Sequence, residues 1–135
     1  MSLKRYAGSC HCGAVRFECE VDLTVGTGRC NCSYCAKARG WGAMAKPDTF
    51  CITAGKDAVS EYQFGTKVGH HCSCKICGIR CFGYGHLDVL GGDFVSVAVA
   101  CLDDVSVEQL TGGPITYQDG RNNAWWNTPA ETVYL

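Results

Sequence analysis

Twelve cysteines in 135 residues constrain this chain more than any other feature of its sequence. At about 9% of the residues, their frequency is typical of a cross-linked scaffold. Nine of them fall in three short clusters, and the glycines nearby favour tight turns. The clusters are Cys10 and Cys12, then Cys30, Cys32 and Cys35, then Cys72, Cys74, Cys77 and Cys81.

The surroundings of the clusters favour metal binding over disulfides. Residues 1–9 contain no apolar run ahead of the first cysteine, so no signal peptide is visible and we expect a cytoplasmic protein. In a reducing compartment, tightly clustered cysteines indicate metal ligands. A secreted disulfide scaffold whose signal peptide has been removed remains the alternative.

Length and charge exclude several classes of function. The chain fits a single domain over residues 1–135. Its net charge of −1 argues against nucleic-acid binding, which usually requires a basic excess. No run approaches the roughly 18 apolar residues of a membrane span, so we expect neither nucleic acid nor membrane as a partner. The oligomeric state is left open.

Hydrophobic patterning predicts a mostly β fold. Residues 14–22 alternate between apolar and charged side chains, which predicts a half-buried strand. Residues 94–102 are rich in β-branched side chains and apolar on both faces, which indicates a more central strand. Shorter strands are expected at residues 49–53, 59–64 and 80–84, and a single helical turn at 104–110. Nothing predicts a long amphipathic helix.

Two cysteine pairs, each followed by glycine, predict a closed zinc site. Cys74 and Cys77 form a Cys-x-x-Cys turn, and Gly78 permits the positive φ that such a turn often needs. Zinc in structural sites prefers four tetrahedral ligands, commonly thiolates. Cys10 and Cys12 are the natural second pair, and the site would join the N-terminal hairpin to the middle of the chain.

The cluster of Cys30, Cys32 and Cys35 predicts a second zinc ion with an open position. Three protein ligands and one exchangeable position are typical of catalytic zinc. Zn²⁺ with three thiolates carries a formal charge of −1, which weakens it as a Lewis acid. Its soft ligands favour a substrate thiol, which binding would deprotonate. Cys72, Cys81 or a histidine could instead complete the site, and both sites would then be structural.

Other residues have less specific interpretations. Lys37 and Arg39 are candidate anchors for a substrate carboxylate, with solvated surface charge as the alternative. Trp41 could line a pocket or belong to the core. The remaining expectations concern core and surface positions: Cys19, Cys51 and Cys101 in the core, Trp125 and Trp126 closing the core, and His11, His70, His71 and His86 at the surface or beside the ligands.

The three motifs together resemble the glutathione-dependent formaldehyde-activating enzyme family, which shares its domain with centromere protein V. Cys-His-Cys-Gly at 10–13, Cys-x-Cys-Ser-x-Cys at 30–35 and Cys-x-x-Cys-Gly at 74–78 occur in the order seen in that family. The resemblance runs from about Gly8 to about Val107. Ser73 departs from it, because the family usually has an aromatic residue there.

This resemblance implies a fold, two zinc ions and an activity. The fold would be several coiled antiparallel β-sheets, like that of the mammalian suppressor of Sec-four. A structural zinc would bind the residues matching Cys10, Cys12, Cys74 and Cys77, and a catalytic zinc those matching Cys30, Cys32 and Cys35. The implied enzyme is a carbon–sulfur lyase that adds glutathione to formaldehyde, giving S-hydroxymethylglutathione. The competing hypothesis is a non-catalytic zinc module that binds a protein or a small thiol.

Overall fold

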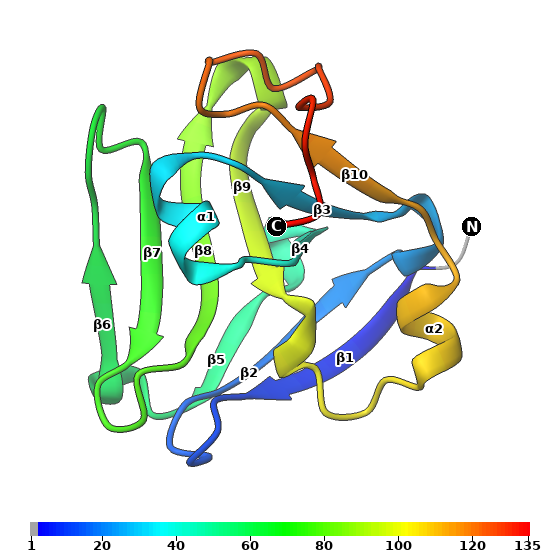
Figure 1. Cartoon of the computed structure of the whole chain (residues 1–135). Coiled ribbons are helices and arrows are strands. Elements are labelled where there is room, and N and C mark those ends of the chain that lie inside the picture. Colours follow the sequence, from blue (N-terminus) through cyan, green and yellow to red (C-terminus); the bar gives the residue numbers. More distant parts are fainter. Residues whose placement is uncertain (1–2) are drawn as a thin grey trace.

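The computed structural model describes residues 3–135, which form two β-sheets accompanied by short helices (Figure 1). The smaller sheet is antiparallel and has the strand order β1-β2-β5. Its strands are β1 (Lys4–Ser9), β2 (Arg16–Val21) and β5 (Cys51–Ala54). In Figure 1 this sheet lies in the lower part of the view, below the centre of the larger sheet.

The larger sheet has seven strands in the order β10-β3-β4-β9-β8-β7-β6. Its strands are β3 (Thr27–Cys30), β4 (Gly42–Ala45), β6 (Val59–Tyr62), β7 (Gly69–Cys74), β8 (Arg80–Leu87), β9 (Gly92–Ala98) and β10 (Ile115–Gln118). All neighbours are antiparallel except β10, which pairs parallel with β3. The antiparallel arrangement expected from the sequence is therefore wrong at this edge.

The helices are short, as the sequence predicts. Helix α1 (Ser33–Ala38) follows β3, and α2 (Val107–Thr111) begins at a capping box formed by Ser106 and Gln109. Single 3₁₀ turns occupy Leu23–Val25, Pro47–Thr49, Lys56–Ala58, Asp88–Leu90 and Val99–Cys101. Within the described residues, no helix has the length and hydropathy needed to cross a lipid bilayer.

Three aromatic rings join the two sheets in the core. Phe17 from β2 is fully buried, and its ring centroid lies 5.7 Å from that of Phe50 and 5.6 Å from that of Phe82 on β8. Gly8 faces Phe17 across the β1–β2 ladder, and a Cβ atom there would lie 2.3 Å from the ring. The absence of a side chain at Gly8 thus makes room for the central ring.

Most of the predicted strands are confirmed, with shifted ends. β2 alternates as expected, and β9 is central, between β4 and β8. The strand predicted at residues 94–102 ends at Ala98, because Val99–Cys101 forms a 3₁₀ turn. The helical turn expected at residues 104–110 begins only after its N-cap at Ser106.

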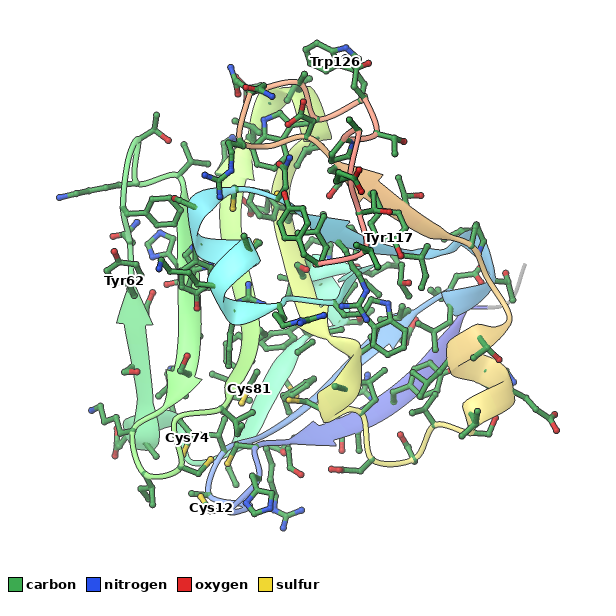
Figure 2. All side chains as sticks on the ribbon, in the orientation of Figure 1. Cys12, Tyr62, Cys74, Cys81, Tyr117 and Trp126 are labelled. Carbon is green, nitrogen blue, oxygen red and sulfur yellow. The ribbon has the colours of Figure 1, made fainter. Side chains whose placement is uncertain are left out.

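Two core assignments are wrong. Cys51 is exposed, because it lies on β5, which pairs only with β2 and forms an edge of the small sheet. Trp125 and Trp126 are 46% and 81% exposed, because the segment after β10 runs over the surface (Figure 2). The single domain over 1–135, of which residues 1–2 lie outside the described part, stays a prediction. So does the likeness to the suppressor of Sec-four.

Replacing the central ring tests this description of the core. Phe17→Ala removes a fully buried side chain that contacts both sheets, so we expect the free energy of unfolding to fall by about 3–5 kcal/mol. Val25→Ala, at a side chain that is 75% exposed, should change it by less than about 0.5 kcal/mol. Urea unfolding of the metal-loaded proteins measures both, and equal losses would contradict the arrangement.

Candidate functional site

Four sulfur atoms meet where the β1–β2 turn lies beside the β7–β8 turn, as the labelled Cys12 and Cys74 show in Figure 2. The Sγ atoms of Cys10, Cys12, Cys74 and Cys77 all lie within 4.8 Å of one another. The Sγ of Cys12 is 3.6 Å from that of Cys10 and 3.7 Å from that of Cys74. The structure thus brings together the four cysteines expected to form the closed site.

Glycine turns give both cysteine pairs their shape. Gly13 and Gly78 have φ angles of 81° and 79°, a region that side-chain-bearing residues rarely adopt. In each turn the glycine N–H donates to the carbonyl of the first cysteine of the pair, at 3.2 Å for Cys10 and 2.9 Å for Cys74. The N–H of Val15 also donates to the Sγ of Cys10 at 3.3 Å, which favours the thiolate.

The geometry and charge of this group fit zinc. A tetrahedral ion with Zn–S bonds of about 2.3 Å holds its sulfurs about 3.8 Å apart, close to the observed spacings of 3.6 and 3.7 Å. Backbone N–H groups of Cys12 and Ile79 lower the pKa of Cys77 to about 6. The fold therefore prepares one thiolate before any cation is bound.

The second group has three sulfurs and is built around the start of α1. Cys30 ends β3, Cys32 is the N-cap of α1, and Cys35 lies within the helix. Their Sγ atoms also lie within 4.8 Å of one another, and no other Cys, His, Asp or Glu among residues 3–135 joins them. Cys72 and Cys81 in particular belong to neither sulfur group.

Hydrogen bonds concentrate negative charge on the middle sulfur of this group. The N–H of Cys35 donates to the Sγ of Cys32 at 3.3 Å, and the N–H of Cys32 donates to the Sγ of Cys30 at 3.3 Å. Hydrogen bonds from the thiols of Cys30 and Cys35 lower the pKa of Cys32 to about 2. Hydrogen bonds with Cys30 and Cys32 raise the pKa of Cys35 in turn. A cation is needed for all three to be thiolates at once.

The segment after β10 packs against the three-sulfur group. The side-chain amide of Asn31 donates to Asp119 at 2.9 Å and accepts from the N–H of Arg121 at 2.9 Å. A Cβ atom at Gly120 would lie 2.7 Å from the Sγ of Cys30, so the backbone approaches that sulfur closely. Asn31 is buried, and its position is therefore fixed by residues about 90 positions away in the sequence.

A cleft of about 650 Å³ extends from the first sulfur group past the end of α1. The lining residues that matter for its chemistry are Cys10, Arg29, Arg39, Trp41, Arg80, Cys101 and Asp103. None of the three arginines forms an ion pair among the described residues, whose ion pairs lie elsewhere. With three guanidinium groups and a single carboxylate, the cleft is suited to anions.

Each arginine of the cleft is held differently. Arg29 lies 5.1 Å from the ring centroid of Trp41, and Arg39 donates to the backbone oxygen of Leu135 at 3.4 Å. Arg80 lies beside α1, with its guanidinium carbon 5.8 Å from the ring centroid of Tyr34 on that helix. The Nε of Arg80 is buried, and no described residue accepts its hydrogen.

An aromatic stack flanks α1 on its other side. Tyr34 stacks on His71 with ring centroids 4.0 Å apart, and burial, reinforced by Arg80, lowers the pKa of His71. Tyr62 and Phe64 continue the stack and line a hollow of about 470 Å³ together with Lys37 of the same helix. Lys37 and Arg39 thus face different cavities, although they are two residues apart.

The structure also places the remaining candidates. Trp41 both lines the cleft and packs against the core, so both interpretations of it hold. Cys19 and Cys101 are buried, as predicted. None of the histidines, at positions 11, 70, 71 and 86, belongs to either sulfur group.

The sequence-based interpretation missed Arg29, Asn31, Arg80 and Gly120. Asn31 had a usable signal, because an amide between two ligand cysteines is well placed to hydrogen-bond a packing segment. Arg29 and Arg80 each adjoin a cysteine cluster in the sequence. Nothing in the sequence indicated that Gly120 would lie against Cys30, because their contact depends on the parallel pairing of β10 with β3.

Comparison with known proteins shows similarity over most of the chain. Residues 5–116 match the family model of the glutathione-dependent formaldehyde-activating enzyme. A protein of Halomonas elongata, provisionally named a glutathione-dependent formaldehyde-activating enzyme, is 50% identical over 79 residues. That match covers 52% of this chain, and it spans only half the length of the curated relative.

A solved structure has a similar fold. The crystal structure of a Rhodobacter sphaeroides protein is 31% identical to this chain and superposes with a TM-score of 0.68. The similarity covers 82% of this chain and 99% of that one.

Serine substitutions distinguish the closed group from other buried cysteines. We expect Cys77→Ser to lose one equivalent of zinc and to unfold, because binding energy at a structural zinc is folding energy. Cys72→Ser is the matched control: Cys72 is buried on the neighbouring strand and belongs to neither sulfur group, so zinc content should be unchanged. Metal analysis and circular dichroism measure the two effects. A Cys77→Ser protein that folds with its zinc content unchanged would contradict the assignment.

Proposed function

The chain belongs to the glutathione-dependent formaldehyde-activating enzyme family, and we propose that it is a zinc-dependent carbon–sulfur lyase for a small thiol such as glutathione and an aldehyde such as formaldehyde. In the forward reaction the thiol sulfur adds to the carbonyl carbon, and the oxygen gains a proton. The product is S-hydroxymethylglutathione, and the reverse reaction expels the thiol.

The observation that carries this proposal is the difference between the two sulfur groups. One has four sulfurs, whereas the group of Cys30, Cys32 and Cys35 has three, with no further ligand among the described residues. A zinc ion held there would have a position for an external ligand and would supply the charge that keeps a bound thiol deprotonated. Because all three ligands are soft sulfurs, a thiol is a better match than water.

The cleft supports glutathione as the thiol. Glutathione carries two carboxylates, and the cleft offers the guanidinium groups of Arg29, Arg39 and Arg80, which have no competing ion pairs within residues 3–135. The cleft also reaches Gly40, where a Cβ atom would lie 4.0 Å from the Sγ of Cys35. A tripeptide anchored by its carboxylates could therefore direct its thiol towards the three-sulfur group. Holding both reactants in one place removes much of the entropic barrier of a bimolecular addition.

The closed group has a structural role in this proposal. Cys10 and Cys12 follow β1, Cys74 ends β7 and Cys77 lies in the turn after it, so a zinc ion bound to them would fasten the small sheet to the large one. Both sites need reduced cysteines, which supports the cytoplasm as the proposed location.

Mutation of Cys32 tests the role of the three-sulfur group. Cys32→Ser should hold one zinc fewer, keep its circular dichroism spectrum, and consume formaldehyde and glutathione no faster than the uncatalysed reaction. Cys51→Ser is the control, because Cys51 is exposed and lies outside both groups. Product formation followed by NMR measures activity. If the wild-type protein binds two zinc ions but does not accelerate the reaction, the proposed reaction is wrong and the non-catalytic zinc module becomes the leading hypothesis.

Mutation of Arg39 tests the cleft as the glutathione site. Arg39→Gln should raise the KM for glutathione about fivefold, equivalent to about 1 kcal/mol, the upper range for an exposed ion pair. The KM for a thiol without carboxylates, such as cysteamine, should not change. Lys37→Gln is the matched control, because Lys37 lies on α1 and lines the other hollow. Equal effects of the two substitutions would place the thiol outside the cleft.

A further inference from the structure

Two buried thiols outside both sulfur groups come from neighbouring segments of the large sheet. Cys81 is near the start of β8 and Cys101 ends the 3₁₀ turn after β9. In the β8–β9 ladder Phe82 pairs with Val97, which places the start of β8 beside that turn. The Sγ of Cys101 lies 3.6 Å from the carbonyl oxygen of Arg80, the residue directly before Cys81, and the Sγ of Cys81 lies 3.4 Å from the carbonyl oxygen of Ile79.

The two thiols differ in their access to the cleft. Cys101 is 7% exposed and lines the cleft of about 650 Å³. Cys81 is 1% exposed and does not line it. Figure 2 shows Cys81 above Cys74, towards the interior from the four-sulfur group. Cys101 thus borders the cleft, and Cys81 lies behind the cleft wall. Thiol–disulfide exchange needs this order, because the first thiol attacks the external disulfide and the second resolves the mixed disulfide.

The charge of the cleft indicates which disulfides it would admit. Arg29, Arg39 and Arg80 line it without ion-pair partners among the described residues. A small disulfide carrying carboxylates would be attracted to this lining, whereas a cationic one would be repelled. Glutathione disulfide has the required charge and the required sulfur–sulfur bond.

We propose that Cys81 and Cys101 form a redox-active dithiol that exchanges with small anionic disulfides, such as glutathione disulfide, entering the cleft. The thiolate of Cys101 attacks one sulfur of the disulfide, forming a mixed disulfide and releasing one glutathione thiolate. The thiolate of Cys81, after giving its proton to solvent, attacks the Cys101 sulfur and releases the second. The pair loses two electrons and becomes a disulfide, and glutathione disulfide gains them and becomes two thiols. This exchange does not depend on the proposed lyase reaction.

Oxidation of this pair would be transmitted to the cleft. The thiol of Cys81 donates to the carbonyl of Ile79 at 3.4 Å, and the thiol of Cys101 donates to the carbonyl of Arg80 at 3.6 Å. A disulfide has no S–H donor, so both hydrogen bonds would be lost. The segment that loses them connects the ligand Cys77 to β8 and places Arg80 in the cleft wall.

Alkylation after equilibration with glutathione tests the proposal directly. Cleavage after Arg80 and Arg121 yields one tryptic peptide, 81–121, whose two cysteines are Cys81 and Cys101. Zinc-loaded protein is equilibrated in buffers of increasing glutathione disulfide, alkylated under denaturing conditions and digested. We expect this peptide to lose both alkyl groups together while bound zinc, measured with a chromogenic chelator, stays constant. A peptide that stays doubly alkylated, or loses its alkyl groups only as zinc is released, overturns the proposal.

Single substitutions test the order of attack. Cys81→Ser should accumulate a mixed disulfide of Cys101 with one glutathione, because the resolving thiol is missing. Cys101→Ser should leave Cys81 fully alkylatable, because Cys81 has no access to the cleft. Cys72→Ser is the matched control: its thiol lies 3.9 Å from the carbonyl oxygen of His70, and its loss should leave the oxidation of peptide 81–121 unchanged. Equal reaction of Cys81 and Cys101 with glutathione in the two single variants would overturn the assigned roles.

Discussion

The meeting of four sulfurs between two turns is the interaction on which the arrangement of the sheets depends. Cys12 and Cys74 are 62 residues apart, and closing such a loop costs conformational entropy. Without a bond between these turns, the small core would have to offset that cost alone. Four thiolates at this spacing repel one another unless a cation lies among them. The ring of Phe17 supports the same junction from the apolar side. At this junction the two sheets thus meet through a sulfur group on the polar side and through packed aromatic rings on the apolar side.

Local chemistry explains what could be predicted from the sequence. A Cys-x-x-Cys-Gly turn fixes two sulfurs by backbone geometry alone, so Cys74 and Cys77 could be paired before the fold was known. The sulfurs of Cys30, Cys32 and Cys35 come from six consecutive residues and meet for the same reason. Strand β2 was equally predictable, because its alternation is set by one buried face.

Tertiary assembly explains what could not be predicted. Arg29 and Arg80 come from strands far apart in the sequence, and only the sheet order makes them walls of one cleft. Cysteine is a residue type that is often buried, but Cys51 lies at a sheet edge and is exposed. Its residue type alone therefore did not predict its burial. Trp126 shows the same limit, because a large apolar side chain does not specify what will cover it.

The parallel pairing of β10 with β3 has an evolutionary consequence. The family match ends at residue 116, yet residues 118–121 hold Asn31 and lie against Cys30. The three sulfurs therefore lie inside the matched portion of the chain, whereas the segment that packs against them lies outside it. A chain with the same three cysteines but a different segment in this place would enclose the sulfurs differently. The surroundings of the three sulfurs can thus change while the cysteines themselves stay the same.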